Sequence, residues 1–256
     1  MTKRLQGRHA LVTGSTSNIG RAIAEAFAAE GAFVVVSGRD QDRGEATVAA
    51  IREQGGRAVF APADLDGTPE ASRALAATAA ALAGGRIDVL VNNAGIFPPT
   101  TTATTDAATF DRVYAVNVKA PYFLTQAVVP GMLAAGGGAV VNLGSWVARL
   151  GIASSALYAS TKGAVETLTR AWAAEFGPQG VRVNAVSPGV IRPPSLDPGA
   201  PQAGAALMQG TPAGAAGHPS AIAAAAVYLA SDEAVFVHGT VLDVDGGRTG
   251  VAVTAA

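Results

Sequence analysis

A tyrosine and a lysine four positions apart are the residues of this chain best suited to chemistry. Tyr158 and Lys162 stand in the run Tyr-Ala-Ser-Thr-Lys, with Ser145 upstream and Asn117 further back. A phenol ionises near pH 10, so it works as an acid or base at neutral pH only when a neighbour stabilises its phenolate. Apolar residues recur at helical spacing after Tyr158, which would place both side chains on one helix face. The pair indicates carbonyl or alcohol chemistry, with Lys162 lowering the pKa of Tyr158.

Ser145 ends an apolar run at residues 139–145 that is typical of a buried strand. A hydroxyl at the carboxyl end of such a strand faces the crevice where open α/β sheets hold their ligands. Ser145 is therefore a candidate to hydrogen-bond a substrate oxygen. A lone Tyr-x-x-x-Lys can also be a partly buried tyrosine followed, one helical turn later, by a solvated lysine with no catalytic role. Motifs elsewhere in the chain must decide between the catalytic and the non-catalytic interpretation.

A second motif lies near the N-terminus, where an apolar strand at residues 10–13 leads through a turn of small residues into a helical stretch at 21–29. Such a turn sets backbone N–H groups and the positive end of a helix against phosphate, and Gly14 and Gly20 allow close backbone approach. Asn18 stands where a third glycine is expected, and asparagine tolerates a left-handed backbone. The sequence predicts a phosphate-binding turn made of Gly14, Thr16, Ser17, Asn18, Ile19 and Gly20; the alternative is a tight connection.

The next strand, residues 32–37, is followed by Gly38, Arg39 and Asp40. An acidic residue at the first of these positions would accept hydrogen bonds from the adenosine ribose of NAD, and Gly38 fills that place. A guanidinium pairs bidentately with phosphate, so Arg39 favours NADP over NAD. A slipped register would instead give Asp40 the ribose role, so NAD stays possible.

These residues resemble the short-chain dehydrogenase/reductase family from Thr13 to Gly247. The family's phosphate motif is matched at Thr13, Gly14, Ile19 and Gly20, with Asn18 as the exception, and its Asn-Asn-Ala-Gly segment follows an apolar strand at residues 89–91. The resemblance implies a tetrad of Asn117, Ser145, Tyr158 and Lys162, with Asn117 anchoring a water-linked proton relay. It implies further cofactor contacts from Asp64, Leu65, Asn92, Ala94, Gly95, Tyr158, Lys162, Pro188, Gly189 and Ile191.

The chain departs from the family's pattern at one loop, and two aromatic residues are candidates for the substrate pocket. The family often has a threonine shortly after the Pro-Gly loop, where this chain has Arg192 followed by two prolines. We therefore leave Pro193 out of the cofactor set, because proline fixes φ and lacks an N–H. Phe97 and Trp146 flank the motifs and are candidates for apolar pocket walls beside Ser145 and Tyr158, although large aromatics are more often ordinary core.

Composition limits the function classes. The chain has 256 residues, no cysteine, a formal charge of −1 and 14% charged residues, which excludes disulfides and gives no basic field for nucleic acid. No apolar run is long enough to span a bilayer and no secretory signal is recognisable, so a cytoplasmic protein is expected. The histidines show no ligand spacing, so no metal is expected. The resemblance implies a homotetramer.

Strands expected near residues 9–13, 32–37, 57–61, 87–91, 138–144, 181–186 and 240–244 alternate with helical stretches. This order predicts one α/β domain over residues 1–256, a doubly wound parallel sheet (Rossmann-like) with helices on both faces. Residues 193–219 are rich in proline, glycine and alanine, and form either a flap over the substrate pocket or a plain surface connection.

The function that these observations favour is an NAD(P)-dependent oxidoreductase that interconverts a ketone and a secondary alcohol by hydride transfer. NADP(H) is the preferred cofactor and NAD(H) the second choice. Two alternatives remain: a non-redox enzyme on the same fold, such as a dehydratase or dehalogenase, and a non-catalytic cofactor-binding regulator. The fold and tetrad are shared by enzymes with many substrates, so the sequence does not name the molecule.

Overall fold

The structure is a computed structural model and describes residues 3–153, 155–194 and 204–252. Seven parallel strands form one sheet in the order β3-β2-β1-β4-β5-β6-β7, which confirms the predicted doubly wound fold. The strands are β1 (His9–Thr13), β2 (Phe33–Gly38), β3 (Arg57–Pro62), β4 (Val89–Asn92), β5 (Gly138–Leu143), β6 (Val181–Pro188) and β7 (Val241–Val244). The helices are α1 (Asn18–Ala29), α2 (Gln41–Glu53), α3 (Pro69–Leu82), α4 (Ala107–Tyr114), α5 (Ala120–Ala134), α6 (Ala156–Phe176) and α7 (Pro219–Ala230).

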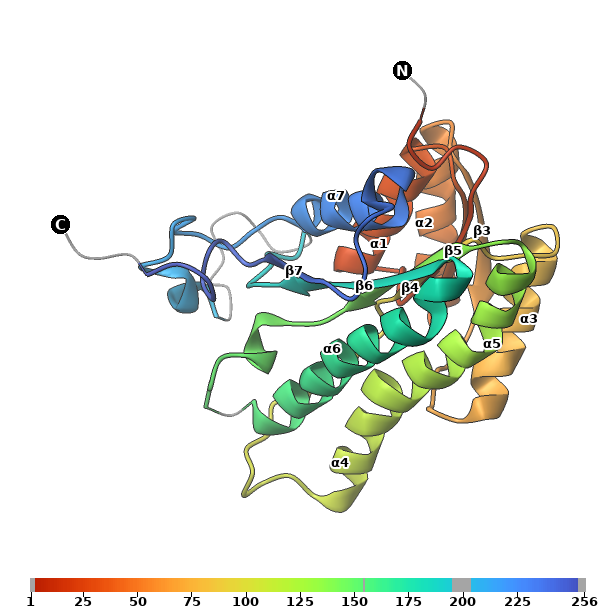
Figure 1. Cartoon of the computed structure of the whole chain (residues 1–256). Helices are drawn as coiled ribbons and strands as arrows, with labels where there is room; N and C mark the ends of the chain where they lie inside the picture. Colours follow the sequence, from red (N-terminus) through yellow and green to blue (C-terminus); the bar gives the residue numbers. More distant parts are fainter. Residues whose placement is uncertain (1–2, 154, 195–203, 253–256) are drawn as a thin grey trace.

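Helices cover both faces of the sheet, with α1, α2 and α7 on one side and α3, α5 and α6 on the other (Figure 1). Alternate strand residues face the two layers, as the pleat requires. Val12, Val34 and Val91 belong to the core that includes α1 and α7, whereas Leu11 and Leu90 belong to the core that includes α3 and α5. Because both faces are buried, the central strands are mostly apolar.

The chain changes direction across the sheet between β1 and β4, which are neighbours with Leu11 paired to Leu90. From β1 the chain moves outward to β2 and β3, and from β4 it moves the other way to β5, β6 and β7. The carboxyl ends of β1 and β4 therefore open a crevice between diverging connections, which is where open α/β sheets bind ligands.

Of the segment expected to be a flap or a surface connection, residues 195–203 lie outside the described residues. The described remainder packs against the C-terminal turn, where the Ala213 N–H donates to Gly246 O at 3.2 Å and Met208 is buried. Together with Val190 and Asp243 this remainder borders a second cavity of about 430 Å³. It is thus anchored at the end of the sheet near β7.

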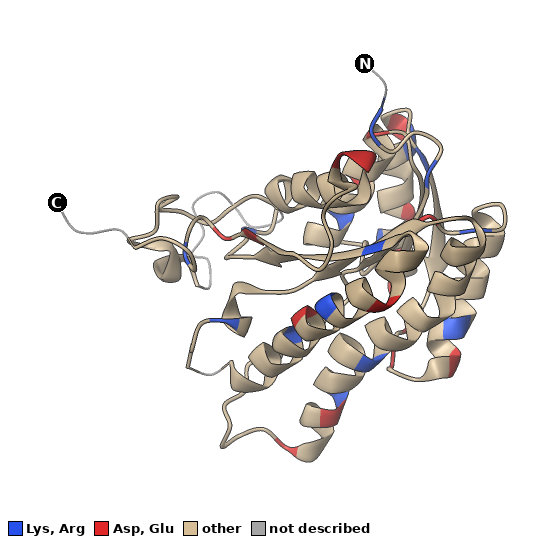
Figure 2. Ribbon diagram, in the orientation of Figure 1, with Lys and Arg blue, Asp and Glu red and all other residues tan. Residues whose placement is uncertain are grey.

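Acidic and basic residues are interspersed over the ribbon (Figure 2), in keeping with the formal net charge of −1. Within the described ranges, no helix has both the length and the apolar character needed to cross a bilayer. In the same ranges, no group of three or more acidic or histidine side chains is arranged to hold a metal ion.

Candidate active site

The crevice at the carboxyl edge of the sheet holds a cavity of about 600 Å³. Its wall begins at the turn between β1 and α1, passes the ends of β2 and β4, and reaches the start of α6. Of the residues expected to bind cofactor or substrate, this wall contains Gly14, Thr16, Ser17, Asn18, Ile19, Gly20, Arg39, Asp64, Leu65, Ala94, Gly95, Phe97, Ser145, Tyr158, Lys162, Pro188, Gly189 and Ile191. Residues from widely separated motifs thus meet in one space.

The turn after β1 is held by the segment that follows β4. The Thr13 hydroxyl donates to Val91 O at 3.1 Å and accepts from the N–H groups of Asn93 and Ala94 at 3.0 Å each. The Asn93 amide donates to the carbonyls of Thr13 and Gly14 at 2.8 and 3.0 Å. A side chain at Gly14 would stand 2.9 Å from Ala94 Cα, so only glycine fits this close approach. Asn93 belongs to the Asn-Asn-Ala-Gly motif but is not among the residues predicted to form the site.

Helix α1 starts with N–H groups that the protein does not cap. Ser17 occupies the N-cap position in an extended conformation, but its side chain makes no capping hydrogen bond. Asn18 follows with φ of 44°, the left-handed conformation expected for the missing glycine. Its Oδ1 is buried with no hydrogen-bond partner among the described residues. Open donors at a helix N-terminus beside a cavity suit a phosphate group.

Two arginines line the cavity beyond β2: Arg39, directly after the strand, and Arg43, in the first turn of α2. Asp40 caps α2 by accepting from the Arg43 N–H at 3.0 Å and pairs with Arg43 Nε at 2.7 Å. These contacts hold the pKa of the Asp40 carboxyl below its ordinary value. Arg39 is exposed and, among the described residues, forms no ion pair or hydrogen bond. A β-carbon at Gly38 would stand 2.6 Å from Thr16 Cγ2, which disfavours an acidic side chain there.

Asp64 and Leu65, after β3, lie on the far side of the same cavity. Asp64 pairs with Arg112 of α4 at 3.5 Å, and both side chains are substantially exposed. Arg112 also lines the cavity. Neither Arg112 nor Arg43 belongs to a local motif, so only the folded arrangement reveals that they face the ligand space.

Tyr158 and Lys162 lie in the first turns of α6, on the wall opposite the phosphate turn. Burial raises the pKa of Tyr158 to about 12, and a hydrogen bond with the Ser145 side chain opposes that rise. Burial lowers the pKa of Lys162 to about 8, against the attraction of Glu166. Lys162 Nζ lies 5.5 Å from the centroid of the Tyr158 ring and donates to Leu143 O at 2.7 Å.

Burial is the largest influence on the pKa of Tyr158 in the structure and raises it, so the expected lowering of that pKa by the Lys162 ammonium stays a prediction. Lys162 is near the phenol as predicted, yet its hydrogen bond goes to the end of β5.

Asn117 lies behind the cavity in a π-helical turn at Ala115–Lys119, between α4 and α5. Such single π turns often mark functional sites. Its Oδ1 accepts from the Ile96 N–H at 2.8 Å, and its Nδ2 donates to Ile96 O at 3.0 Å and to Thr161 Oγ1 at 3.2 Å. The amide therefore joins the segment after β4 to the helix that carries Tyr158 and Lys162.

Three of the predicted site residues, all within the described ranges, do not line the cavity: Asn92, Asn117 and Trp146. Asn92 was expected to contact cofactor, but its Nδ2 donates to Thr125 Oγ1 and to Asn142 Oδ1, at 3.1 and 2.9 Å, inside the protein. Trp146, a substrate candidate, is buried as core, being 5% exposed. Phe97 is 58% exposed, and its ring centroid is 4.5 Å from that of Tyr158. Of the two aromatic candidates, Phe97 is thus the one in position.

Comparison with known proteins agrees with this geometry. A family model described as enoyl-(acyl carrier protein) reductase matches residues 14–249. A galactitol 2-dehydrogenase (L-tagatose-forming) from Cereibacter sphaeroides is 42% identical, over 96% of each chain. A cyclopentanol dehydrogenase from a Comamonas species is 39% identical, over 96% of this chain and 98% of the relative.

Solved structures show the same likeness. A short-chain dehydrogenase/reductase from Serratia marcescens BCRC 10948 has a TM-score of 0.89 and 33% identity, covering 96% of this chain and all of that one. The chain belongs to the short-chain dehydrogenase/reductase family. It is an oxidoreductase that acts on CH–OH groups, and its family implies a nicotinamide cofactor.

Proposed function

We propose that this oxidoreductase uses NADP(H) in preference to NAD(H) and interconverts a ketone and a secondary alcohol, with Tyr158 as the acid and base. The observation that carries the proposal is that Ser145, Tyr158 and Lys162 meet in one cavity wall, with Lys162 Nζ 5.5 Å from the centroid of the Tyr158 ring. Cyclopentanol and the C2 position of galactitol are secondary alcohols, and both occur in the names of relatives. A homotetramer and a cytoplasmic location stay predictions.

The residues present fit a nicotinamide dinucleotide. The uncapped start of α1 and the Gly14 turn would hold its phosphates, and Ala94 and Gly95 would lie along its length toward Lys162. Pro188 and Gly189 would border the nicotinamide, as the family resemblance implies. The bound cofactor supplies or accepts the hydride.

In the reductive direction, Ser145 and Tyr158 would hold the carbonyl oxygen between their hydroxyls. The phenol carries its proton at neutral pH, but burial raises its pKa to about 12, so its transfer to the developing alkoxide needs a neighbour that stabilises the phenolate. Lys162, with its pKa lowered to about 8, is mostly charged at pH 7 and favours the phenolate that remains. Asn117 would anchor the proton relay behind them.

The wall beside Tyr158 suits an apolar ketone. Phe97 packs on the Tyr158 ring and leaves much of its own surface exposed, and Ile96 and Ile191 also line the cavity. Apolar walls with a few convergent polar groups are typical of small-molecule sites. The polar groups here are the two hydroxyls that would bind the oxygen.

The preference for NADP(H) rests on the charge at the end of β2. Arg39 and Arg43 line the cavity there, and Asp40, which lines it beside them, is already bonded to Arg43. A guanidinium pairs well with phosphate. Arg39 is therefore assigned to the phosphate that distinguishes NADP from NAD.

Replacing Tyr158 by phenylalanine tests the acid/base role. Tyr158→Phe removes the proton donor and keeps the ring, so turnover of a ketone with NADPH should fall by about two to four orders of magnitude. Cofactor affinity, measured by NADPH fluorescence, should change little. Tyr122→Phe is the matched control, because the exposed Tyr122 of α5 packs against Trp172 away from the cavity wall. Near-normal turnover by Tyr158→Phe would reject the assignment.

A further inference from the structure

A carboxylate that the proposed chemistry does not use lies directly behind the catalytic wall. Glu166 is one helical turn beyond Lys162 on α6, and it is 4% exposed. A buried carboxylate is costly unless neighbours compensate its charge, and such groups often belong to functional sites. The contacts of Glu166 show what it supports.

On one side, Glu166 contacts the turn that presents Ser145. The Ser145 N–H is among the groups that lower the pKa of the Glu166 carboxyl. A β-carbon at Gly144 would stand 3.0 Å from Glu166 Oε1, so glycine leaves the space that the carboxylate occupies. Oε1 itself has no hydrogen-bond partner among the described residues. The carboxylate therefore packs against Gly144, the residue that precedes Ser145.

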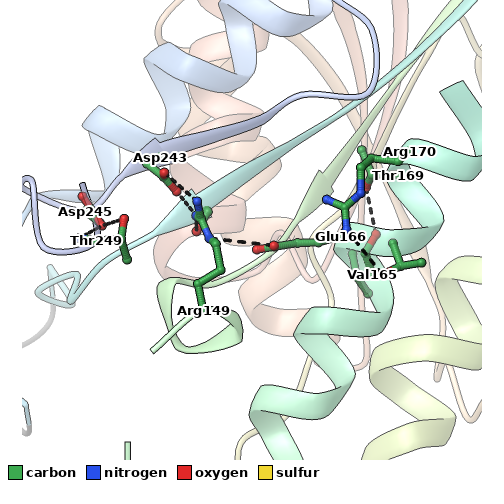
Figure 3. Close-up of polar contacts among 10 residues, drawn as sticks. Arg149, Val165, Glu166, Thr169, Arg170, Asp243, Asp245 and Thr249 are labelled. Carbon is green, nitrogen blue, oxygen red and sulfur yellow. Dashed lines mark hydrogen bonds and ion pairs between the residues drawn. The ribbon is translucent and has the colours of Figure 1, made fainter. Parts of the chain in front are cut away.

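On its other sides, Glu166 faces cations. Lys162 and Arg170 of α6 and Arg149, which follows Ser145 in the chain, all attract it. Arg149 Nε is 3.9 Å from Glu166 Oε2. Figure 3 shows Arg149 between Glu166 and Asp243, with hydrogen bonds directed at both oxygens of Asp243.

Arg149 is itself fixed by strands at the same edge of the sheet. Its Nη1 donates to Asp243 Oδ2 of β7 at 2.7 Å, and its Nη2 donates to Asp243 Oδ1 and to Ser187 Oγ of β6 at 3.0 Å. Burial raises the pKa of Glu166, and the arginines, the Ser145 N–H and Lys162 oppose that rise. A fixed guanidinium favours the charged carboxylate more than a mobile one would, because little ordering entropy is lost.

We propose that Glu166 is a positioning residue of the active site, whose buried carboxylate packs against Gly144 beside Ser145 and favours the Lys162 ammonium one helical turn away, with the Arg149–Asp243 pair at its other side. The inference rests on the proposed acid/base roles of Tyr158 and Lys162. Lys162 is the group through which Glu166 acts on the reaction, since a neutral Lys162 would no longer favour the Tyr158 phenolate.

The charge of Lys162 can be followed directly, because the chain has only three lysines, Lys3, Lys119 and Lys162. In protein labelled with ¹³C-lysine, the Lys162 Cε signal gives the midpoint of its titration. Glu166→Gln keeps the size of the side chain but removes its charge, so the midpoint should fall by about one pH unit. Glu166→Asp retains a carboxylate and should restore most of the shift.

The same variants separate this inference from the proposed function. If Glu166 acts through Lys162, the alkaline limb of ketone reduction should move to lower pH in Glu166→Gln by the shift seen in the titration. Glu175→Gln, at an exposed position of α6, is the control and should move neither. An unchanged Lys162 midpoint in Glu166→Gln would overturn the role of Glu166. A wild-type protein that reduces no ketone would overturn the proposed function, while the titration would still report on Glu166.

Discussion

The buried charge of Lys162 should lower the unfolding free energy at neutral pH, so a variant without this charge should be more stable than wild type. Burial lowers the pKa of Lys162 from 10.5 to about 8, so the folded protein binds this proton less tightly than the unfolded chain does. A tenfold change in proton affinity equals about 1.4 kcal/mol, so carrying the charged lysine at pH 7 costs about 3 kcal/mol of unfolding free energy.

The sign follows from the direction of the shift. Below pH 8 both states hold the proton and the whole cost applies. Between pH 8 and 10.5 the unfolded chain binds more protons, so stability rises with pH and the cost fades. Lys162→Met removes the charge and also the hydrogen bond to Leu143 O, which is worth about 1 kcal/mol. The variant should therefore be about 2 kcal/mol more stable than wild type at pH 7 and about equal at pH 10.

Urea unfolding at fixed protein concentration, followed by the fluorescence of the two buried tryptophans, Trp146 and Trp172, gives both free energies. Lys119→Met is the control, since Lys119 is exposed and its removal relieves no buried charge. The pH dependence is the decisive quantity, because any packing change caused by methionine is the same at both pH values. A difference between Lys162→Met and wild type that does not change from pH 7 to pH 10 would refute the reasoning.

Two further variants test the cofactor end. Arg39→Ala should lower the affinity for NADPH about tenfold to a hundredfold, because a charge-assisted hydrogen bond contributes about 1.5–3 kcal/mol, and should leave the affinity for NADH almost unchanged. Both affinities are measured by fluorescence titration, with Arg57→Ala, at an exposed position of β3, as the control. Equal losses of affinity for the two cofactors would reject the phosphate assignment. Asn18→Ala should lower the unfolding free energy by about 1 kcal/mol, because alanine tolerates the left-handed φ of 44° poorly. Asn18→Gly should change the unfolding free energy little. Equal stability of the two variants in urea would show that the backbone is not strained there.

The elements of the fold could be predicted because each is encoded locally. Strand β1 was predicted at residues 9–13 and lies at His9–Thr13, and β2 differs from its predicted bounds by one residue at each end. Apolar runs between turn residues mark buried parallel strands with few alternatives. The helix that carries Tyr158 and Lys162 was likewise recognisable from its apolar spacing and is observed as α6.

Roles that depend on which face a side chain takes were harder to predict. Asn92 and Asn93 are adjacent in one motif, yet Asn92 bonds to neighbours within the core and Asn93 clamps the phosphate turn. Successive side chains at a strand end point to opposite faces of the sheet, and this alternation, which the motif itself does not show, decides which asparagine takes which role. Arg43 and Glu166 were missed because their importance comes from Asp40 and Arg149, contacts that only the folded chain brings about.

The way Asn117 holds Ile96 has a consequence for how this enzyme could change. Both groups of the Asn117 amide bond to the Ile96 backbone, so the chain is pinned at the last point before Phe97. Beyond that point, residues 97–105 form a loop without helix or strand. Loops on a rigid scaffold tolerate substitution and insertion. If Phe97 lines the substrate site as proposed, substitutions in this loop should change substrate scope while Asn117 keeps the proposed proton-transfer residues in place.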